Sequence, residues 1–168
     1  MGKRAMVTTA TLLAGAIWLG LWGLNPERGN AEVLDDSQSQ KAVLDQLREL
    51  QRAAQALDAD KLFSYVLENN QGVLAQDGRL YLTRQQALES TRRGLAALQN
   101  IRYRFTDEHV TLLSPTIALA VQQGSATATA ADGQSFSRPF VQSVLLVLTN
   151  GQWKVFHAHR STPVEASR

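Results

Sequence analysis

The chain has 168 residues, of which 44% are hydrophobic and 19% are charged. This composition is typical of a single globular domain and excludes the apolar-poor, highly charged mixture that keeps a chain disordered. The net charge of +2 resides at the N-terminal end, because Lys and Arg equal Asp and Glu in number once residues 1–31 are set aside, and a neutral domain is not expected to bind nucleic acid.

Residues 1–31 have the pattern of an export segment. Lys3 and Arg4 precede an uncharged, mostly apolar run over residues 5–24, like the charged and hydrophobic regions of a signal peptide. A helix of that length rises about 30 Å and would also cross a bilayer core. Small residues that a signal peptidase prefers follow near Ala31. We therefore expect a signal peptide or a membrane anchor, with the domain exported: periplasmic, extracellular or tethered through residues 5–24.

Three helices are expected at the start of the domain. The first follows an N-cap near Asp35, and its apolar residues recur at steps of three and four: Val43, Leu47, Leu50, Ala54 and Leu57. A shorter second helix is expected to start with Leu62, Phe63 and Val66. The third begins at a capping box of Thr83 and Gln86, and we expect it to end at Gly94.

Strands make up the rest of the domain. A short hairpin is predicted around Asp77-Gly78, a pair that tolerates the positive φ angles of a type I′ turn. From Ile101 onward apolar and polar residues alternate, which is typical of strands. The later strands cover residues 116–130, 136–148 and 153–161, with tight turns at Asp132-Gly133 and Asn150-Gly151.

This order of elements predicts an α+β domain over residues 32–163, with a frayed tail over residues 164–168. Three N-terminal helices pack on one face of a strongly curved antiparallel sheet. Helices and sheet together enclose a cone-shaped cup, which is a common place for a small ligand.

Three segments carry a resemblance to a known family: Leu57-Asp58-Ala59-Asp60, Gln76-Asp77-Gly78-Arg79 and the run from Trp153 to Ser161. With the order of elements over about residues 40–163, they resemble the nuclear transport factor 2-like (cystatin-like) superfamily, and within it the SnoaL-like domains. The last strand is similar to that of the association domain of calcium/calmodulin-dependent protein kinase II. The superfamily hosts isomerases, cyclases, dehydratases and non-catalytic domains.

The resemblance to the kinase association domain implies that Arg160 points into the cup, where that family holds anionic small molecules. Further pocket arginines of that family correspond here to Ala126 and Val144. The catalytic aspartate of the steroid isomerases of the superfamily corresponds to Ala75 or Gln76, neither of which can accept a proton at neutral pH. The resemblance therefore favours binding over isomerase chemistry.

Strand alternation predicts which residues accompany Arg160. Lys154, Phe156, Ala158 and Arg160 are expected on one face of the last strand, and Trp153, Val155, His157, His159 and Ser161 on the other. Arg160 and Phe156 are therefore candidate ligand contacts. Tyr65 and Tyr103 are further candidates that would either line the cup with hydroxyl groups or belong to the core.

His157 and His159 lie two residues apart on one strand face, which suits a polar or interface pair. No third ligand is placed beside them, as a catalytic zinc site would need. The chain has no cysteine, so thiolate metal sites and a cysteine nucleophile are excluded. We expect no metal and no cofactor.

The leading functional hypothesis is an exported SnoaL-like domain that binds a small, partly apolar molecule, able to carry a negative charge, without catalysis. The apolar strand segments 117–121 and 144–148 indicate burial on both faces, and hence a homodimer through the exposed face of the sheet. Two alternatives stay open. One is an isomerase, cyclase or dehydratase using Tyr65, His157 or Arg160, and the other is a structural oligomerisation module.

Overall fold

The computed structural model describes residues 35–69 and 71–163. The export segment over residues 1–31 and the tail over residues 164–168 lie outside the described residues, so both stay predictions. Within the described ranges, no helix is long and apolar enough to cross a membrane.

The first helix begins at the expected cap, whereas the second begins at Ala59, three residues before the predicted start at Leu62. Helix α1 spans Asp36–Gln55 and α2 spans Ala59–Phe63. The Asp35 carboxylate accepts a hydrogen bond of 2.8 Å from the backbone N–H of Gln38, and the Gln38 side chain accepts one from the Asp35 N–H. This reciprocal capping box satisfies donors that the first turn leaves unpaired. The N-cap predicted near Asp35 is confirmed.

Helix α3 spans Arg84–Ala96 and begins at the predicted capping box of Thr83 and Gln86. Its predicted end at Gly94 is wrong, because the helix continues past this residue. The next residue, Leu95, is 9% exposed and belongs to the hydrophobic core. Burying a leucine stabilises by about 2 kcal/mol, which outweighs the roughly 1 kcal/mol that an interior glycine costs a helix.

Six strands form one sheet in the order β2-β1-β6-β5-β4-β3. Their bounds are β1 Leu74–Gln76, β2 Arg79–Tyr81, β3 Leu98–Ser114, β4 Ile117–Ala130, β5 Ser135–Thr149 and β6 Gln152–Ser161. Neighbours from β3 to β6 are antiparallel, as predicted. The sheet is nevertheless mixed, because β1 runs parallel to β6. A tight turn would force antiparallel pairing, but the two strands are joined only through all the elements between them.

Two hairpin turns have the predicted geometry. Asp77 and Gly78 have φ angles of 49° and 78°, and Asn150 and Gly151 have φ angles of 51° and 74°. Two successive positive φ values are the mark of a type I′ turn, whose twist matches that of the flanking strands.

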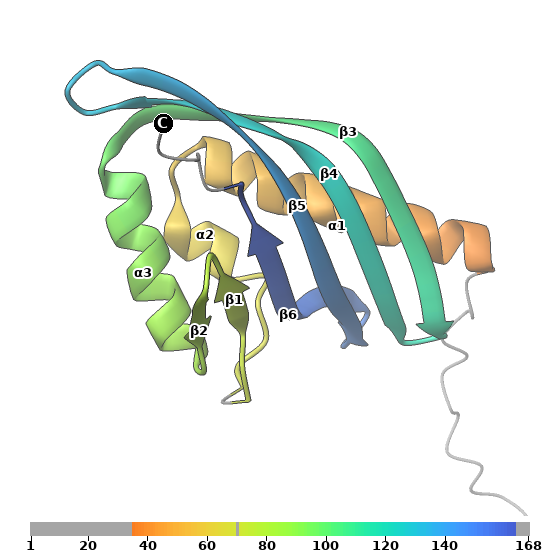
Figure 1. The fold of residues 1–168 in the computed structure, drawn as a ribbon. Coiled ribbons are helices and arrows are strands. Elements are labelled where there is room, and N and C mark those ends of the chain that lie inside the picture. The colour runs from red at the N-terminus through yellow and green to blue at the C-terminus, as the bar shows by residue number, and fades with distance from the viewer. Residues whose placement is uncertain (1–34, 70, 164–168) are drawn as a thin grey trace, which may run out of the picture. The chain divides into compact units, whose positions relative to one another are not determined.

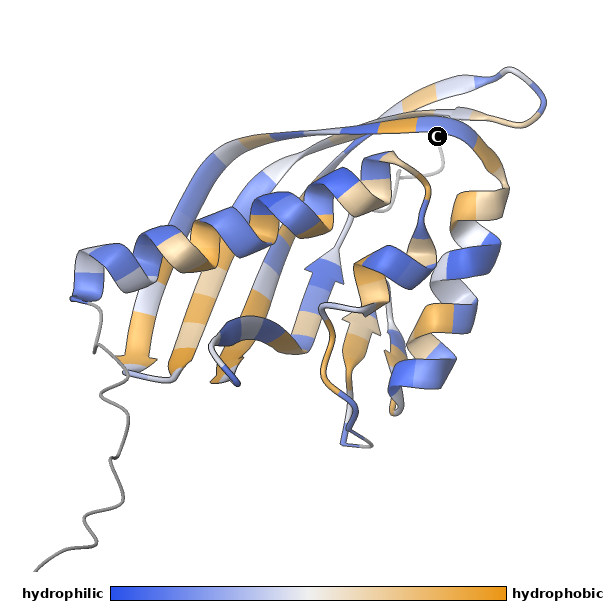
Figure 2. Ribbon diagram, turned by 180° about the vertical axis from the view of Figure 1, so that it is seen from behind, coloured by the Kyte–Doolittle hydropathy of each residue, from blue (hydrophilic) through white to orange (hydrophobic). Residues whose placement is uncertain are grey.

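The helices lie on one face of the curved sheet (Figure 1). Figure 2 shows α1 laid across this inner face, and the strands behind it carry long apolar stretches. Helices α2 and α3 lie near the short β1–β2 hairpin at one end of the domain. The predicted α+β class, with helices packed on a curved sheet, is confirmed.

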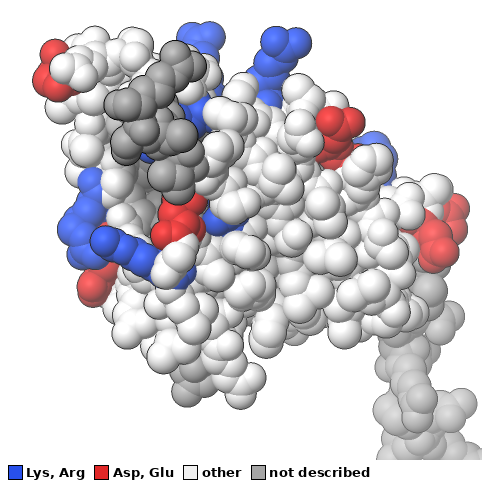
Figure 3. All heavy atoms as spheres, viewed as in Figure 1, with Lys and Arg blue, Asp and Glu red and all other residues white. Residues whose placement is uncertain are grey.

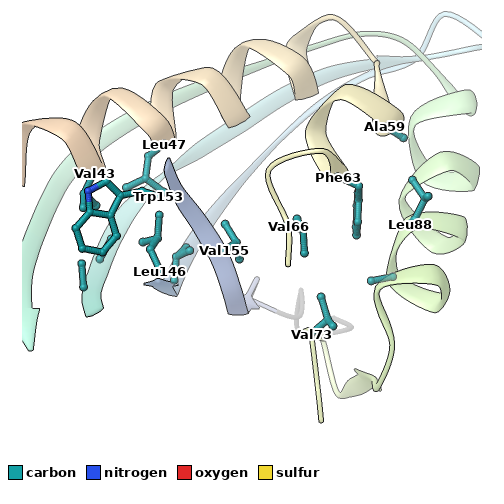
Figure 4. Close-up of a cluster of buried hydrophobic side chains, with 14 of the residues drawn as sticks. Val43, Leu47, Ala59, Phe63, Val66, Val73, Leu88, Leu146, Trp153 and Val155 are labelled. Atoms are coloured by element: carbon teal, nitrogen blue, oxygen red, sulfur yellow. The ribbon is translucent and has the colours of Figure 1, made fainter. Parts of the chain in front are cut away.

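The core fills the space between helices and sheet (Figure 4). Leu146 is fully buried, and Trp153 is 4% exposed on the neighbouring strand, toward α1. Phe63 and Leu88 fill the end formed by α2 and α3. The core thus gathers at the two ends of the inner face.

Candidate functional site

A cavity of about 180 Å³ opens among α1, α2 and the inner face of the sheet. Its wall is mainly apolar: Leu47, Leu50 and Ala54 from α1, Leu62, Phe63 and Val66 from and after α2, and Val73, Leu74, Phe105, Val144, Val155 and Ala158 from and beside the sheet. A dry cavity of about 150 Å³ lined by hydrocarbon accommodates benzene. This cavity therefore suits a single ring or a short branched chain.

The polar part of the lining is made mostly of amides. It consists of Gln51, Gln76, Thr91, Tyr103, Gln122, Gln142 and Arg160. Among the lining residues that the structure describes, Arg160 is the only charged side chain, and none is Asp, Glu, His, Lys or Cys. The cup therefore offers one cation and several neutral hydrogen-bonding groups.

The guanidinium of Arg160 is held by hydrogen bonds and by aromatic rings. Its Nε and Nη2 atoms donate to Oε1 of Gln142 at 3.0 and 2.6 Å, and Nη1 donates to the Tyr103 hydroxyl at 3.5 Å. Its Cζ atom lies 4.4 Å from the ring centre of Phe140 and 5.2 Å from that of Tyr103. An arginine has N–H groups to spare after these contacts, one on each terminal nitrogen. These two donors have no partner among the described residues.

Helix α1 holds the backbone of Tyr103 at the β3 edge of the sheet. The edge strand β3 exposes backbone groups at this residue, and two glutamines of α1 satisfy them. Gln51 donates to the Tyr103 carbonyl at 3.2 Å, and Gln55 accepts from its N–H at 3.0 Å. The helix therefore holds the backbone of the residue whose ring lies against Arg160.

Arg160 ends a row of side chains that crosses the sheet from strand to strand. Glu108 on β3 faces Gln122 on β4, which faces Gln142 on β5, which faces Arg160 on β6. Gln122 donates to Oε2 of Glu108 at 2.6 Å, and Gln142 donates to Oε1 of Gln122 at 2.6 Å. We call these four residues the cross-sheet row.

A bulge in β3 brings Glu108 into this row. Tyr103 and Phe105 line the cavity, so strict alternation would turn Glu108 to the outer face. The register between β3 and β4 shifts after Phe105, which leaves Thr106 unpaired and sets Glu108 opposite Gln122. The extra residue moves Glu108 to the inner face.

A second bulge, in β6, corrects the predicted faces of that strand. Val155, Ala158 and Arg160 all line the cavity, although strict alternation would separate Val155 from the other two. The register shift leaves Phe156 unpaired, so the strand changes phase there. The predicted face assignment is therefore wrong for the first half of the strand: Trp153 and Val155 point inward, and Phe156 is not among the lining residues.

The other candidate residues divide between the cavity and its surroundings. Tyr103 lines the cavity, whereas Tyr65 does not. The ring of Tyr65 instead contacts Lys61, whose Nζ atom lies 5.0 Å from the ring centre. His157 has Nδ1 at 2.8 Å from the Gly72 carbonyl oxygen, and His159 is exposed. Neither histidine reaches the cavity, and their role as a polar or interface pair stays a prediction.

Among the residues that the structure describes, no three potential metal ligands of the His, Cys, Asp and Glu types lie together. The position that the superfamily resemblance gives to a catalytic base is taken by Gln76 in the lining. An amide there can orient a ligand by hydrogen bonds but cannot take its proton.

Asp77 follows Gln76 in the chain and belongs to the turn between β1 and β2. Burial raises the pKa of Asp77, but hydrogen bonds from Thr162 and Gln76 and the positive charge of Arg160 outweigh this effect. The pKa of Asp77 therefore lies below its ordinary value, and the carboxylate is held ionised.

The sequence interpretation missed three members of the cross-sheet row: Glu108, Gln122 and Gln142. A signal for one of them is present in the sequence. Gln122 follows the buried positions Ala118 and Ala120 at a period of two, so it interrupts an apolar strand face with an amide. A polar residue at a buried position requires a partner, which points to a network across the sheet.

Comparison with known families shows a match over most of the domain. The family model described as "SnoaL-like domain" matches residues 43–165. No curated protein matches the sequence.

Several solved structures share the fold at low sequence identity. A candidate dehydratase of the nuclear transport factor 2-like family from Streptomyces avermitilis has a TM-score of 0.69 and 19% identity, over 76% of this chain and 98% of that chain. A candidate calcium/calmodulin dependent protein kinase II association domain from Xanthomonas campestris has a TM-score of 0.65 and 16% identity, over 80% and 93%. A hexachlorocyclohexane dehydrochlorinase from Novosphingobium barchaimii has a TM-score of 0.65 and 13% identity, over 76% and 88%. These likenesses show the fold.

Proposed function

The chain belongs to the family of SnoaL-like domains, and from that premise we propose that its cup binds a small, mostly apolar monocarboxylate without converting it. The observation that supports this most is that Arg160 is the single cation in a lining that is otherwise uncharged, as far as the described residues form it. The apolar wall accommodates a ring or short branched chain, and the carboxylate pairs with the two remaining donors of Arg160.

The energetics of Arg160 favour an anionic ligand. Among the described residues, no carboxylate lies within 4 Å of the Arg160 guanidinium, and the ionised Asp77 acts on it only at longer range. A partly buried guanidinium without a directly bonded ionised partner costs up to several kcal/mol in lost hydration. A carboxylate that accepts two parallel N–H bonds offsets this cost with charge-assisted hydrogen bonds.

The lining supports binding over turnover. Proton transfer in catalysis needs a group whose pKa lies near the working pH, and carboxylate and imidazole groups are absent from the described lining. The similar structures include proteins named as a dehydratase and a dehydrochlorinase. Chemistry of that kind here would require a base that the described lining does not supply.

The test compares a carboxylate with a neutral molecule of the same shape. Native mass spectrometry of the purified domain first shows whether a molecule is retained, and titration calorimetry then compares benzoate with benzamide. We expect benzoate to bind more tightly, and Arg160→Met to weaken it roughly 10-fold to 100-fold, as the loss of charged hydrogen bonds implies. Arg138→Met is the matched control, because Arg138 stacks on Phe136 outside the cavity. Equal affinity for the two molecules, or no effect of Arg160→Met, would contradict the proposal.

We also propose that the domain forms a homodimer through the outer face of the sheet. Ile117, Val121 and Val141 are 36%, 39% and 47% exposed on this face, and Figure 3 shows a broad uncharged surface over β4 and β5. A second copy offers the same apolar patch, so the contact can be self-complementary. Light scattering should give a dimer, and Val121→Glu should give a monomer. Leu80→Glu on the edge strand β2, where Leu80 is 61% exposed, serves as the control that stays dimeric.

Residues 1–31 support a further proposal, that the domain works outside the cytoplasm. A fusion of these residues to a reporter enzyme that is active only after export tests it. Activity that persists when Lys3 and Arg4 are kept but the run over residues 5–24 is deleted would contradict export through this segment.

A further inference from the structure

We propose that Glu108 is a positioning residue that fixes the hydrogen-bond direction of the cross-sheet row, so that the cup selects a singly charged acceptor group over a neutral amide. Glu108 is exposed and is not a lining residue, so it acts on the ligand only through the row. This inference rests on the proposed function for the ligand, but its first test needs none.

The two ends of the row determine the orientation of both amides between them. An ionised carboxylate only accepts hydrogen bonds, a guanidinium only donates them, and an amide has one end of each kind. Gln122 donates to Glu108 at 2.6 Å, Gln142 donates to Gln122 at 2.6 Å, and Arg160 donates twice to Gln142. Every one of these bonds exists only if both amides point the same way.

Reversing one amide breaks the hydrogen bonds on both sides of that amide. A flipped Gln142 would turn its NH₂ group toward the guanidinium of Arg160, donor against donor. Gln122 is 2% exposed, so water does not readily replace a lost partner of its amide. The Glu108 carboxylate therefore acts with Arg160, from the opposite end of the row, to disfavour the flipped arrangement, although it lies three strands away from Arg160.

The direction of the row decides what the cavity presents to a ligand. When Gln142 accepts, the Nε–Nη2 edge of the guanidinium faces it, and the guanidinium plane lies against the rings of Phe140 and Tyr103. Each terminal nitrogen then keeps one N–H donor for the ligand. Tyr103 accepts from Nη1, so its own hydroxyl hydrogen is also available as a donor. A cluster of donors suits a carboxylate, whose two oxygens only accept.

The row also limits the charge of the ligand. Glu108 carries one negative charge and Arg160 one positive charge, joined by neutral amides, so the row as a whole is neutral. One carboxylate adds a single charge near Arg160, whereas a phosphate dianion would bring a second charge without a second cation in the described lining. The charge balance therefore favours a monocarboxylate over a phosphate.

Two variants of Glu108 separate its roles. Glu108→Gln keeps an acceptor oxygen for Gln122 and should preserve the direction of the row, whereas Glu108→Ala removes the acceptor. Asp107→Ala is the matched control, because it removes a carboxylate from the adjacent residue, which pairs with the exposed Gln123. A thermal unfolding curve for each variant checks that the variant is folded at the temperature of the binding and NMR experiments.

The first measurement uses the ligand-free protein. The side-chain NH₂ resonances of Gln122 and Gln142, assigned from Gln122→Leu and Gln142→Leu, should be the same in the wild type, Glu108→Gln and Asp107→Ala. In Glu108→Ala they should shift and exchange faster with solvent. Unchanged resonances in Glu108→Ala would overturn the inference.

The second measurement is the ratio of benzoate affinity to benzamide affinity. We expect this ratio to fall roughly tenfold in Glu108→Ala, to recover in Glu108→Gln and to be unchanged in Asp107→Ala. Changed resonances with an unchanged ratio would overturn the selective role. If the wild type binds neither molecule, nor phosphate, the proposed function fails, while the amide spectra still decide the direction of the row.

Discussion

Gly124 and Arg104 approach so closely across β4 and β3 that a Cβ atom on Gly124 would overlap the carbonyl oxygen of Arg104. Gly124 is paired with Phe105, the last residue before the β3 bulge. The missing side chain therefore leaves room for the kinked backbone that carries Glu108 to the inner face.

Gly124→Ala should destabilise the domain. The obstacle is backbone rather than the end of a flexible side chain, so relief requires a shift of β3, and overpacking of this kind costs about 1–3 kcal/mol. Urea unfolding followed by circular dichroism measures the loss. An unchanged midpoint would show that β3 can move away without cost.

Gly94→Ala should have the opposite effect. Gly94 lies inside α3 without a positive φ angle, and a Cβ atom there meets nothing within 4 Å. Alanine lowers the conformational entropy of the unfolded chain and should raise the free energy of unfolding by about 0.5–1 kcal/mol. Comparison of the two glycine variants under the same urea conditions removes any general effect of adding a methyl group.

Asp77 should make stability depend on pH in the acid range. Its folded pKa lies below the ordinary value, so its contribution is fully present above about pH 3.9, the unfolded pKa, and is lost as the pH falls through the folded pKa. Asp77→Asn keeps a turn residue that tolerates the φ of 49° and an acceptor for Thr162, but it does not titrate. Urea unfolding at about pH 5 and about pH 3 should show a larger loss for the wild type than for this variant. Equal losses would contradict the prediction.

Arg84 should stabilise the end of the domain that α2 and α3 form. Its Nε and Nη2 atoms donate to the Phe63 carbonyl at 3.0 and 2.7 Å, and Nε also reaches the Val66 carbonyl at 3.2 Å. Arg84→Met keeps the aliphatic stem and should cost about 1.5–3 kcal/mol, the usual range for hydrogen bonds to a charged group. Arg93→Met, an exposed residue of the same helix, should change the free energy of unfolding by less than about 0.5 kcal/mol. Similar losses in both variants would contradict a specific role for Arg84.

The sequence predicted the elements whose signals are local. The caps at Asp35 and Thr83 and the turns at Asp77-Gly78 and Asn150-Gly151 act within a few residues, so a single chain segment contains the whole signal. The end of α3 at Gly94 was predicted wrongly because burial of Leu95, a tertiary effect, outweighs the local preference of glycine.

The candidate site depends on relations that no single segment contains. Arg160 was placed in the cup by resemblance, but Thr106 and Phe156 carry no mark of the bulges that they form, since a bulge is a property of two paired strands. Each bulge reverses the face of every residue after it. The cross-sheet row was therefore hidden, although its four residues were all visible in the sequence.

The parallel pairing of β1 with β6 affects how the domain folds. Leu74 pairs with Ala158, 84 positions later in the chain, and both residues line the cavity. Closing so long a loop is entropically costly, and non-local pairing of this kind slows folding. The helices and the β3–β4–β5–β6 meander can form early from near neighbours, but the cup gains its last wall only when β1 docks against β6. A ligand present during refolding would therefore bind only after this last step. It would slow unfolding of the finished domain and leave the folding rate unchanged.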